Sequence, residues 1–204
     1  MAKKQKEIKK SDKKEATIYG KFFRIVMSVV FALLIMSQIS KIFFDVTPPL
    51  WKKHKLEKFS NPIYVSHYEF FDMEKQLHSL YEYDQGLTIL AFWATWCPYC
   101  SVEMPEMADF YASIQDMPVK IIPIIHPGEG SSDAYNFYIE RNIDGTLMPP
   151  YFPANEAFHR GLKIKGYPSF MIADKYGQVF ARFRPDWKDK EGLRSLLEEL
   201  LVAK

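Results

Sequence analysis

The chain has only two cysteines, Cys97 and Cys100, and they are separated by Pro98 and Tyr99. A thiol attacks a disulfide as its thiolate, and a second thiol one helical turn away can resolve the mixed disulfide that forms. We therefore expect Cys97 to attack a substrate and Cys100 to release it by attacking the sulfur of Cys97. In this cycle the protein's own disulfide is the redox centre and no further cofactor is needed.

Two cysteines can also serve other purposes. A static disulfide across three residues closes too short a loop to stabilise the fold much. A zinc site needs two more ligands, and the five histidines show no paired spacing. We therefore expect no metal site. Copper handling stays open as an alternative because thiolates bind Cu(I) and Met104 and Met107 follow the pair, although methionines at this spacing often fill a core.

The sequence around the cysteines predicts the elements that hold them. Leu87 to Phe92 is an uninterrupted apolar run, typical of a central strand buried on both faces. We expect a helix to follow from Cys97 to about Ile114, with Pro105 as a kink inside it. The free amides and the dipole of its first turn would stabilise the Cys97 thiolate.

The remaining sequence alternates between strand and helix patterns. We expect a strand at residues 119–125, helices at 134–141 and 155–162, a hairpin of 169–173 with 178–183, and an amphipathic helix at 190–202. This order predicts a layered α/β domain.

Residues 92–100, Phe-Trp-Ala-Thr-Trp-Cys-Pro-Tyr-Cys, with Glu103 and Pro105 after them and 166–168, Gly-Tyr-Pro, downstream, resemble the thioredoxin superfamily. Within it the chain is similar to the membrane-anchored TlpA/ResA/CcmG-like branch of bacteria. The resemblance covers about residues 60–204. It implies a thioredoxin-like fold, with a central mixed sheet flanked by helices, and thiol-disulfide oxidoreductase activity on protein substrates. It also implies an electron donor of the DsbD/CcdA type in the membrane.

The resemblance assigns roles to residues around the cysteines. Pro168 matches the cis-proline that lies against them and leaves a backbone edge free for substrate, although an ordinary turn proline is the alternative. Tyr167 is bulkier than its counterpart in many relatives, so we expect a different substrate selectivity. Trp96 is expected to cover the sulfurs, and Pro98 and Tyr99 to shape the site.

Glu103 matches a buried glutamate that, in ResA-like proteins, tunes the acidity of the cysteines and shuttles protons. A carboxylate buried beside the thiols has a raised pKa and opposes their ionisation. A solvated glutamate on the helix surface is the alternative. We interpret His126 and His159 as surface or satisfied polar residues, because nothing in their spacing connects them to the cysteines.

Residues 25–40 contain no charge and predict a membrane segment. Sixteen helical residues reach about 24 Å of the roughly 30 Å hydrocarbon core, so we extend the span to 22–44. A cleaved signal peptide is disfavoured because no small-residue cleavage site follows, and a buried core helix is the other alternative. We expect a basic cytoplasmic tail at 1–21, a transmembrane helix at 22–44, a juxtamembrane linker at 45–60 and the thioredoxin-like domain at 61–204.

Charge is distributed unevenly along the chain. Residues 1–24 carry nine Lys and Arg against three Asp and Glu, which leaves the rest of the chain net negative. The folded part therefore gives no reason to expect nucleic-acid binding. The positive-inside bias predicts a single-pass protein of the bacterial inner membrane, with its N-terminus in the cytoplasm and the catalytic domain in the periplasm.

Two hypotheses remain for the direction of electron flow. A reductase of particular protein disulfides is favoured by the branch resemblance and by Glu103. A disulfide oxidase or isomerase of secreted proteins would need a more oxidising couple. The Pro98-Tyr99 dipeptide does not decide between them.

Overall fold

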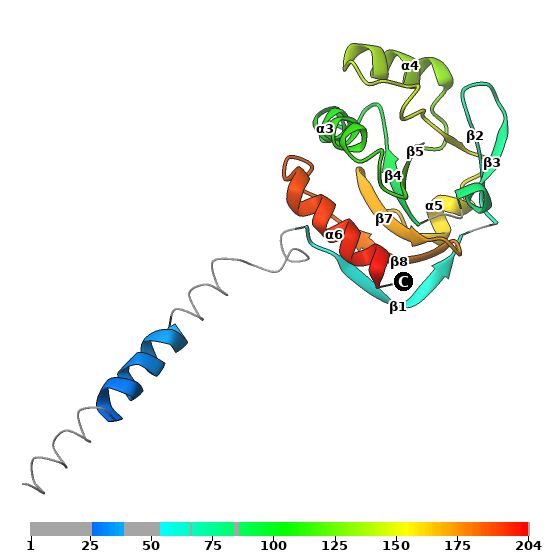
Figure 1. The fold of residues 1–204 in the computed structure, drawn as a ribbon. Coiled ribbons are helices and arrows are strands. Elements are labelled where there is room, and N and C mark those ends of the chain that lie inside the picture. The colour runs from blue at the N-terminus through cyan, green and yellow to red at the C-terminus, as the bar shows by residue number, and fades with distance from the viewer. Residues whose placement is uncertain (1–25, 39–53, 66, 84–85, 204) are drawn as a thin grey trace, which may run out of the picture. The chain divides into compact units, whose positions relative to one another are not determined.

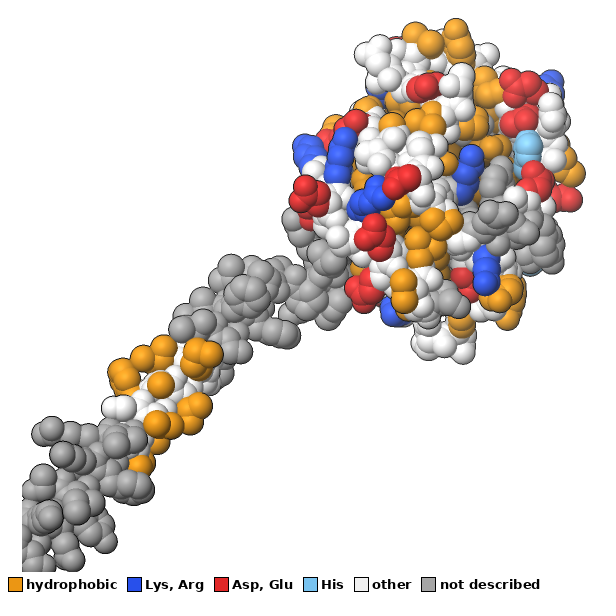
Figure 2. All heavy atoms as spheres, viewed as in Figure 1, with side chains coloured by type: hydrophobic (Ala, Val, Ile, Leu, Met, Phe, Trp, Pro, Cys, Tyr) orange, Lys and Arg blue, Asp and Glu red, His pale blue; other side chains and the backbone are white. Residues whose placement is uncertain are grey.

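The computed structural model describes residues 26–38, 54–65, 67–83 and 86–203, and the chain divides into two compact units, 1–48 and 49–204 (Figure 1). In the first unit, residues 26–38 form a helix with exposed side chains that are almost all hydrophobic (Figure 2). Within the described ranges, no helix is both long and apolar enough to cross a membrane. The expected basic tail, both ends of the expected span and residues 45–53 of the expected linker lie outside those ranges.

The second unit is built on a five-stranded mixed sheet of order β1-β8-β7-β4-β5. Its strands are β1 (Glu57–Tyr64), β4 (Leu87–Trp93), β5 (Val119–Ile125), β7 (Ser169–Asp174) and β8 (Gln178–Phe183). The central strand β4 is fully buried and pairs in parallel with β5 and antiparallel with β7. The expected central strand, second strand and hairpin are therefore confirmed.

Alternate residues along the strands of the sheet point into two separate hydrophobic cores, one on each face. Ile89, Ala91 and Trp93 pack on the face covered by α3 (Cys100–Ser113), α4 (Ser131–Glu140) and α6 (Lys190–Val202). Leu90 and Phe92 point to the opposite core, which α5 (Ala157–Gly161) covers. Figure 1 shows α3 and α6 together on one side of the sheet and α5 on the other. Burial on both faces explains the sequence of β4, which is apolar except for Thr88.

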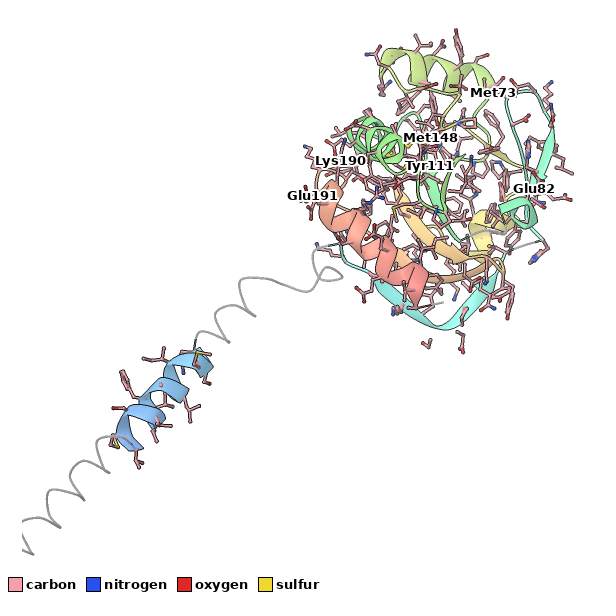
Figure 3. All side chains as sticks on the ribbon, in the orientation of Figure 1. Met73, Glu82, Tyr111, Met148, Lys190 and Glu191 are labelled. Atoms are coloured by element: carbon pink, nitrogen blue, oxygen red, sulfur yellow. A yellow bond between two sulfur atoms is a disulfide. The ribbon has the colours of Figure 1, made fainter. Side chains whose placement is uncertain are left out.

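Figure 3 illustrates the difference between the core and the surface of this unit. Tyr111 of α3 and Met148 belong to the first core and are 4% and 0% exposed. Lys190 and Glu191 lie at the outer start of α6, where the Lys190 ammonium pairs with Asp109 of α3. The start of α6 is thus connected to the body of α3 across the domain surface by an ion pair, while the inner faces of the two helices share apolar contacts.

Both edge strands of the sheet contain a proline. Pro123 of β5 lies on the outer edge, as the absence of an N–H group on proline requires. The adjacent segment covers that edge, because the Tyr151 N–H donates to the Pro123 carbonyl (2.8 Å) and the Ile125 N–H donates to the Tyr151 carbonyl (2.9 Å). At the other edge, β1 contains Pro62 and has an irregular register with β8 between Lys58 and Ile63.

Several features differ from the sequence prediction. The folded unit starts before the expected residue 61, because β1 begins at Glu57 and His54 is fully buried. A second sheet of order β3-β2-β6 was not predicted; it consists of β2 (Glu69–Phe71), β3 (Leu77–Ser79) and β6 (Phe152–Pro153), with the 3-10 helix η1 (Leu80–Tyr83) after β3. These short strands have no clear alternation of apolar and polar residues that a sequence pattern could reveal.

Candidate active site

Cys97 and Cys100 form a disulfide at the carboxyl end of β4, with their Cα atoms 5.2 Å apart. Cys97 is 3% exposed and Cys100 is fully buried. Cys97 Sγ accepts a hydrogen bond from the Cys100 N–H at 3.2 Å. Cys97 is therefore slightly the more accessible of the two cysteines, and the Cys100 backbone amide is directed at its sulfur.

The start of the helix differs from the prediction. Helix α3 begins at Cys100 and not at Cys97, with Tyr99 as its N-cap residue. Residues 98 and 99 form a turn, and the first helical bonds run to the carbonyls of Cys97 and Tyr99, with Ser101 N–H to Cys97 at 3.3 Å and Glu103 N–H to Tyr99 at 2.9 Å. Cys97 precedes the helix, but the helix N-terminus can still stabilise its thiolate, because the Cys97 sulfur accepts a hydrogen bond from the first helical N–H. Pro105 lies inside α3 as expected, and the helix continues through it.

The peptide bond between Tyr167 and Pro168 is cis, which confirms the prediction from the family resemblance. Both residues are partly exposed and precede β7. They line a groove of about 470 Å³ together with Tyr99, Glu103 and Arg184. Residues from the cysteine turn, from α3 and from the cis-proline segment thus meet in one hollow.

Glu103 is half-buried in this groove, and burial raises the pKa of its carboxyl. The indole N–H of Trp187 faces the carboxylate and acts in the opposite direction, although the two do not meet the geometry of a hydrogen bond. The charge of Glu106 raises the pKa further, and that of Arg184 lowers it. Glu103 thus lies between the two alternatives, neither fully buried nor fully solvated.

The other residues that were expected to shape the site lie at its rim. Trp96 is 62% exposed and Tyr99 is 73% exposed, and Pro98 is exposed as well. The Trp96 ring packs edge-on against His126 and Tyr167, with 5.7 Å between ring centroids in both pairs. It forms a wall beside the cysteine turn that is continuous with the cis-proline segment.

Two histidines belong to this wall, although the sequence did not connect them to the cysteines. The His126 ring lies 5.5 Å from the Tyr167 ring, and His159 lies 5.0 Å from Phe92 and 6.2 Å from Tyr167. His159 is buried, and neither of its ring nitrogens has a hydrogen-bond partner among the described residues. Burial lowers the pKa of His159 to about 4, with a smaller contribution from His126. The interpretation of His159 as a surface or satisfied residue is therefore wrong.

Glu129 is a further residue that the sequence reasoning missed. Its Oε2 accepts from the Thr95 N–H at 3.0 Å and from the Thr95 hydroxyl. Burial raises the pKa of the Tyr167 phenol to about 12, and the charge of Glu129 adds to the shift. Because β4 and β5 are parallel, the residues after each strand meet at the same edge, and this topology is the signal that could have placed Glu129 and His126 beside Cys97.

The copper alternative receives no support from the methionines. Met104 is 1% exposed and Met107 is fully buried, and both pack in the core beneath α3. In the ranges that the structure describes, no group of three or more His, Cys, Asp or Glu side chains could hold a metal ion.

A cysteine pair between a buried strand and a helix, facing a cis-proline on the same mixed sheet, defines the thioredoxin-like thiol-disulfide oxidoreductases. The model of the AhpC/TSA family matches residues 54–184. The chain belongs to the AhpC/TSA family.

Curated relatives point to the same class. The chain is 28% identical over 129 residues to the thiol-disulfide oxidoreductase ResA of Geobacillus thermodenitrificans, covering 63% of this chain and 71% of the relative. It is 30% identical over 123 residues to the ResA of Oceanobacillus iheyensis, covering 59% of this chain and only 54% of that relative.

Solved structures show the same fold. The thioredoxin domain of a thiol-disulfide oxidoreductase from Bacteroides vulgatus superimposes with a TM-score of 0.56 at 16% identity, covering 70% of this chain and 99% of that one. The pneumococcal exposed lipoprotein thioredoxin from Streptococcus pneumoniae gives a TM-score of 0.52 at 21% identity, covering 64% and 97%.

Proposed function

We propose that the protein is a membrane-tethered reductase that acts on particular protein disulfides outside the cytoplasm through Cys97 and Cys100. The observation that carries this proposal is the Cys97–Cys100 disulfide at the start of α3, where Tyr99 between the cysteines lines one groove with cis-Pro168. In the cycle, the Cys97 thiolate attacks a substrate sulfur and the other substrate sulfur leaves as a thiol. Cys100 then attacks Cys97, which releases the second substrate thiol and leaves the protein disulfide.

Glu103 supports the reducing direction. A strong oxidant such as DsbA owes its potential to a stabilised reduced form, in which a thiolate is favoured. The half-buried Glu103 carboxyl acts against this, because its negative charge repels a thiolate one helical turn away. A less stable dithiol form means a more negative potential, which suits a reductase better than an oxidase or isomerase.

The N-terminal segment supports the tether. Residues 25–40 are uncharged, and residues 26–38 form a helix whose large apolar side chains are exposed, for instance Phe31 and Leu33 at 66% and 64%. Such a surface needs an apolar environment. The basic residues before it favour a cytoplasmic N-terminus and a periplasmic domain at the bacterial inner membrane. A membrane protein of the DsbD/CcdA type is the electron donor that this arrangement needs.

Two measurements on the full chain test the proposal, one on the purified protein in nonionic detergent and one in cells. The first is the reduction potential of the Cys97/Cys100 couple, which we expect near or below that of thioredoxin, about −270 mV. The second is covalent trapping in bacterial cells, where Cys100→Ser should accumulate mixed disulfides through Cys97. The double variant Cys97→Ser/Cys100→Ser is the control and should trap nothing.

Each result can also contradict the proposal. A potential near that of DsbA, about −120 mV, would make the protein an oxidant. Trapped partners that are all cytoplasmic, or a catalytic domain that is protected from protease added outside spheroplasts, would contradict the periplasmic location.

A further inference from the structure

Beside the groove lined by Tyr99, Glu103 and Pro168 lies a second cavity, of about 350 Å³, whose charged lining is entirely basic. Lys163 and Lys165 come from the segment before Pro168, and Arg182 and Arg184 from the end of β8 and the residue after it. Segments separated in sequence therefore bring four cations to one hollow. This concentration is unusual for a chain whose residues after position 24 are net negative.

The two hollows adjoin on the substrate side of the site. Tyr167, Pro168 and Arg184 line both of them. A polypeptide bound across Pro168 with a cysteine at Cys97 would therefore extend into the basic cavity on one side. The four cations therefore differ from those of an ordinary solvated surface. Figure 2 shows such a surface, on which basic and acidic side chains are interspersed.

The four cations have little internal compensation. Within the part of the chain that the structure describes, none of them forms an ion pair, whereas Arg141, Lys188 and Arg194 each pair with a carboxylate. Three acidic groups flank them: Glu57 lies opposite Arg182 across β1 and β8, and Glu103 and Asp186 line the adjoining groove. The lining of the cavity itself contains no carboxylate.

The backbone next to the cavity is also available to a partner. Neither the N–H nor the carbonyl of Tyr167 makes a backbone hydrogen bond to any described residue. The pairing of β7 with β4 begins only at Ser169, which lies opposite Phe92. An extended peptide can satisfy such groups by strand addition, and this geometry favours a polypeptide over an isolated anion as the occupant.

We propose that the cavity selects substrate proteins with a cluster of Asp or Glu residues a few positions from the reactive cysteine. This inference rests on the proposed function and adds the substrate class. Cations that form no ion pair with a described residue attract such a segment, accelerate its encounter with Cys97 and orient it across Pro168. Neutral disulfides still react, but without this acceleration.

The test compares disulfide peptides of one core sequence with a tail of four Asp, four Ser or four Lys residues. The reduced full chain in nonionic detergent is mixed with each peptide at low ionic strength, and the second-order rate constant is measured. We expect the Asp peptide to react about tenfold faster than the Ser peptide, and the advantage to disappear as salt is raised. The Lys peptide should be slowest.

Matched variants locate the effect. Lys163→Gln/Lys165→Gln removes two exposed cations of the cavity, whereas Lys75→Gln/Lys175→Gln removes two exposed cations that do not line it. The first variant should lose most of the preference for the Asp peptide and keep its rate with the Ser peptide. The second should keep the preference.

Equal rates for the Asp and Ser peptides, or an equal loss in both double variants, would overturn the proposal. So would a result in which the cavity variant keeps the Asp preference but loses binding to mixed micelles containing phosphatidylglycerol, because the cations would then serve a lipid surface. The proposed function is judged separately by 4,4′-dithiodipyridine, a small neutral disulfide. If the wild type fails to reduce it, the redox assignment fails, whatever the peptides show.

Discussion

Replacing Glu103 by glutamine tests whether this carboxylate restrains the cysteines. Glu103 lies one helical turn after Cys100 in α3, and burial raises its pKa. The raised pKa means that the folded site disfavours negative charge there, and a thiolate nearby adds to that cost. The glutamine variant keeps the size of the side chain and removes the charge. We therefore expect the pKa of the Cys100 thiol, one helical turn from Glu103, to fall in Glu103→Gln.

The size of this shift follows from the helix geometry. Side chains three residues apart on a helix have Cβ atoms about 5–6 Å apart. Two unit charges about 6 Å apart repel by about 2.8 kcal/mol at an effective dielectric constant of about 20, which is equivalent to about two pKa units. Because Glu103 is only half-buried, solvent screens part of this repulsion. We expect a decrease of about one pKa unit.

The assay is the pH dependence of thiolate absorbance in the reduced full chain, with Cys97→Ser as the common background so that only the Cys100 thiol titrates. Where the thiolate predominates, stabilising it by one pKa unit also makes the reduction potential about 30 mV more positive. Glu106→Gln is the matched control, because Glu106 lies on the same helix but farther from Cys100 and pairs with Lys188 at 3.1 Å. An unchanged or raised thiol pKa in Glu103→Gln, or an equal shift in Glu106→Gln, would refute the reasoning.

Three further predictions concern stability, measured by urea unfolding. Trp187→Ala removes a buried indole that is 2% exposed, and should lower the free energy of unfolding by about 3–5 kcal/mol, whereas Trp187→Phe should cost less. Asp189→Ala removes the cap of α6, which accepts from the Gly192 N–H, and should cost about 1 kcal/mol, with Asp189→Asn nearly neutral. His159 has a pKa of about 4 in the fold, below its unfolded value of about 6.5, so the unfolded chain binds more protons and stability should fall as pH drops through this window. His159→Gln should flatten this dependence, and His67→Gln should not.

Each of these predictions has a clear opposite outcome. Equal unfolding midpoints for Trp187→Ala and Trp187→Phe would mean that the indole is not part of the core. If Asp189→Asn lowered the free energy of unfolding as much as Asp189→Ala, the effect of Asp189 would come from its charge and not from capping. A pH dependence that is the same with and without His159 would show that this histidine is solvated in the folded protein.

The sequence predicted those parts of the fold that have strong local patterns. The apolar run of β4, the hairpin of β7 and β8, and the leucine pattern of α6 all fall where expected. The second sheet was missed because its strands are short and its pairs are distant, as in Phe71 with Phe152. Strand β1 was missed because six of its eight residues are exposed and its apolar residues do not alternate with polar ones.

The site was predictable to the extent that it is contained in one motif. Cys97, Cys100 and Glu103 lie within one turn and one helix, and the family resemblance added cis-Pro168. The approach of His126 to the site depends on the parallel register that sets Trp93 opposite Ile125, which no local pattern reveals. The burial of His159 likewise follows from the packing of α5 on the second core.

The prolines at the two edges of the sheet affect whether copies of the protein associate with one another through their edge strands. An open edge strand invites pairing with an identical chain and so promotes aggregation. Pro123 with the covering Tyr151 closes one edge, and Pro62 with the irregular register of β1 interrupts the other. The long edges of the domain thus resist pairing with a second copy, while the backbone of Tyr167, beside the groove, makes no backbone hydrogen bond to any described residue.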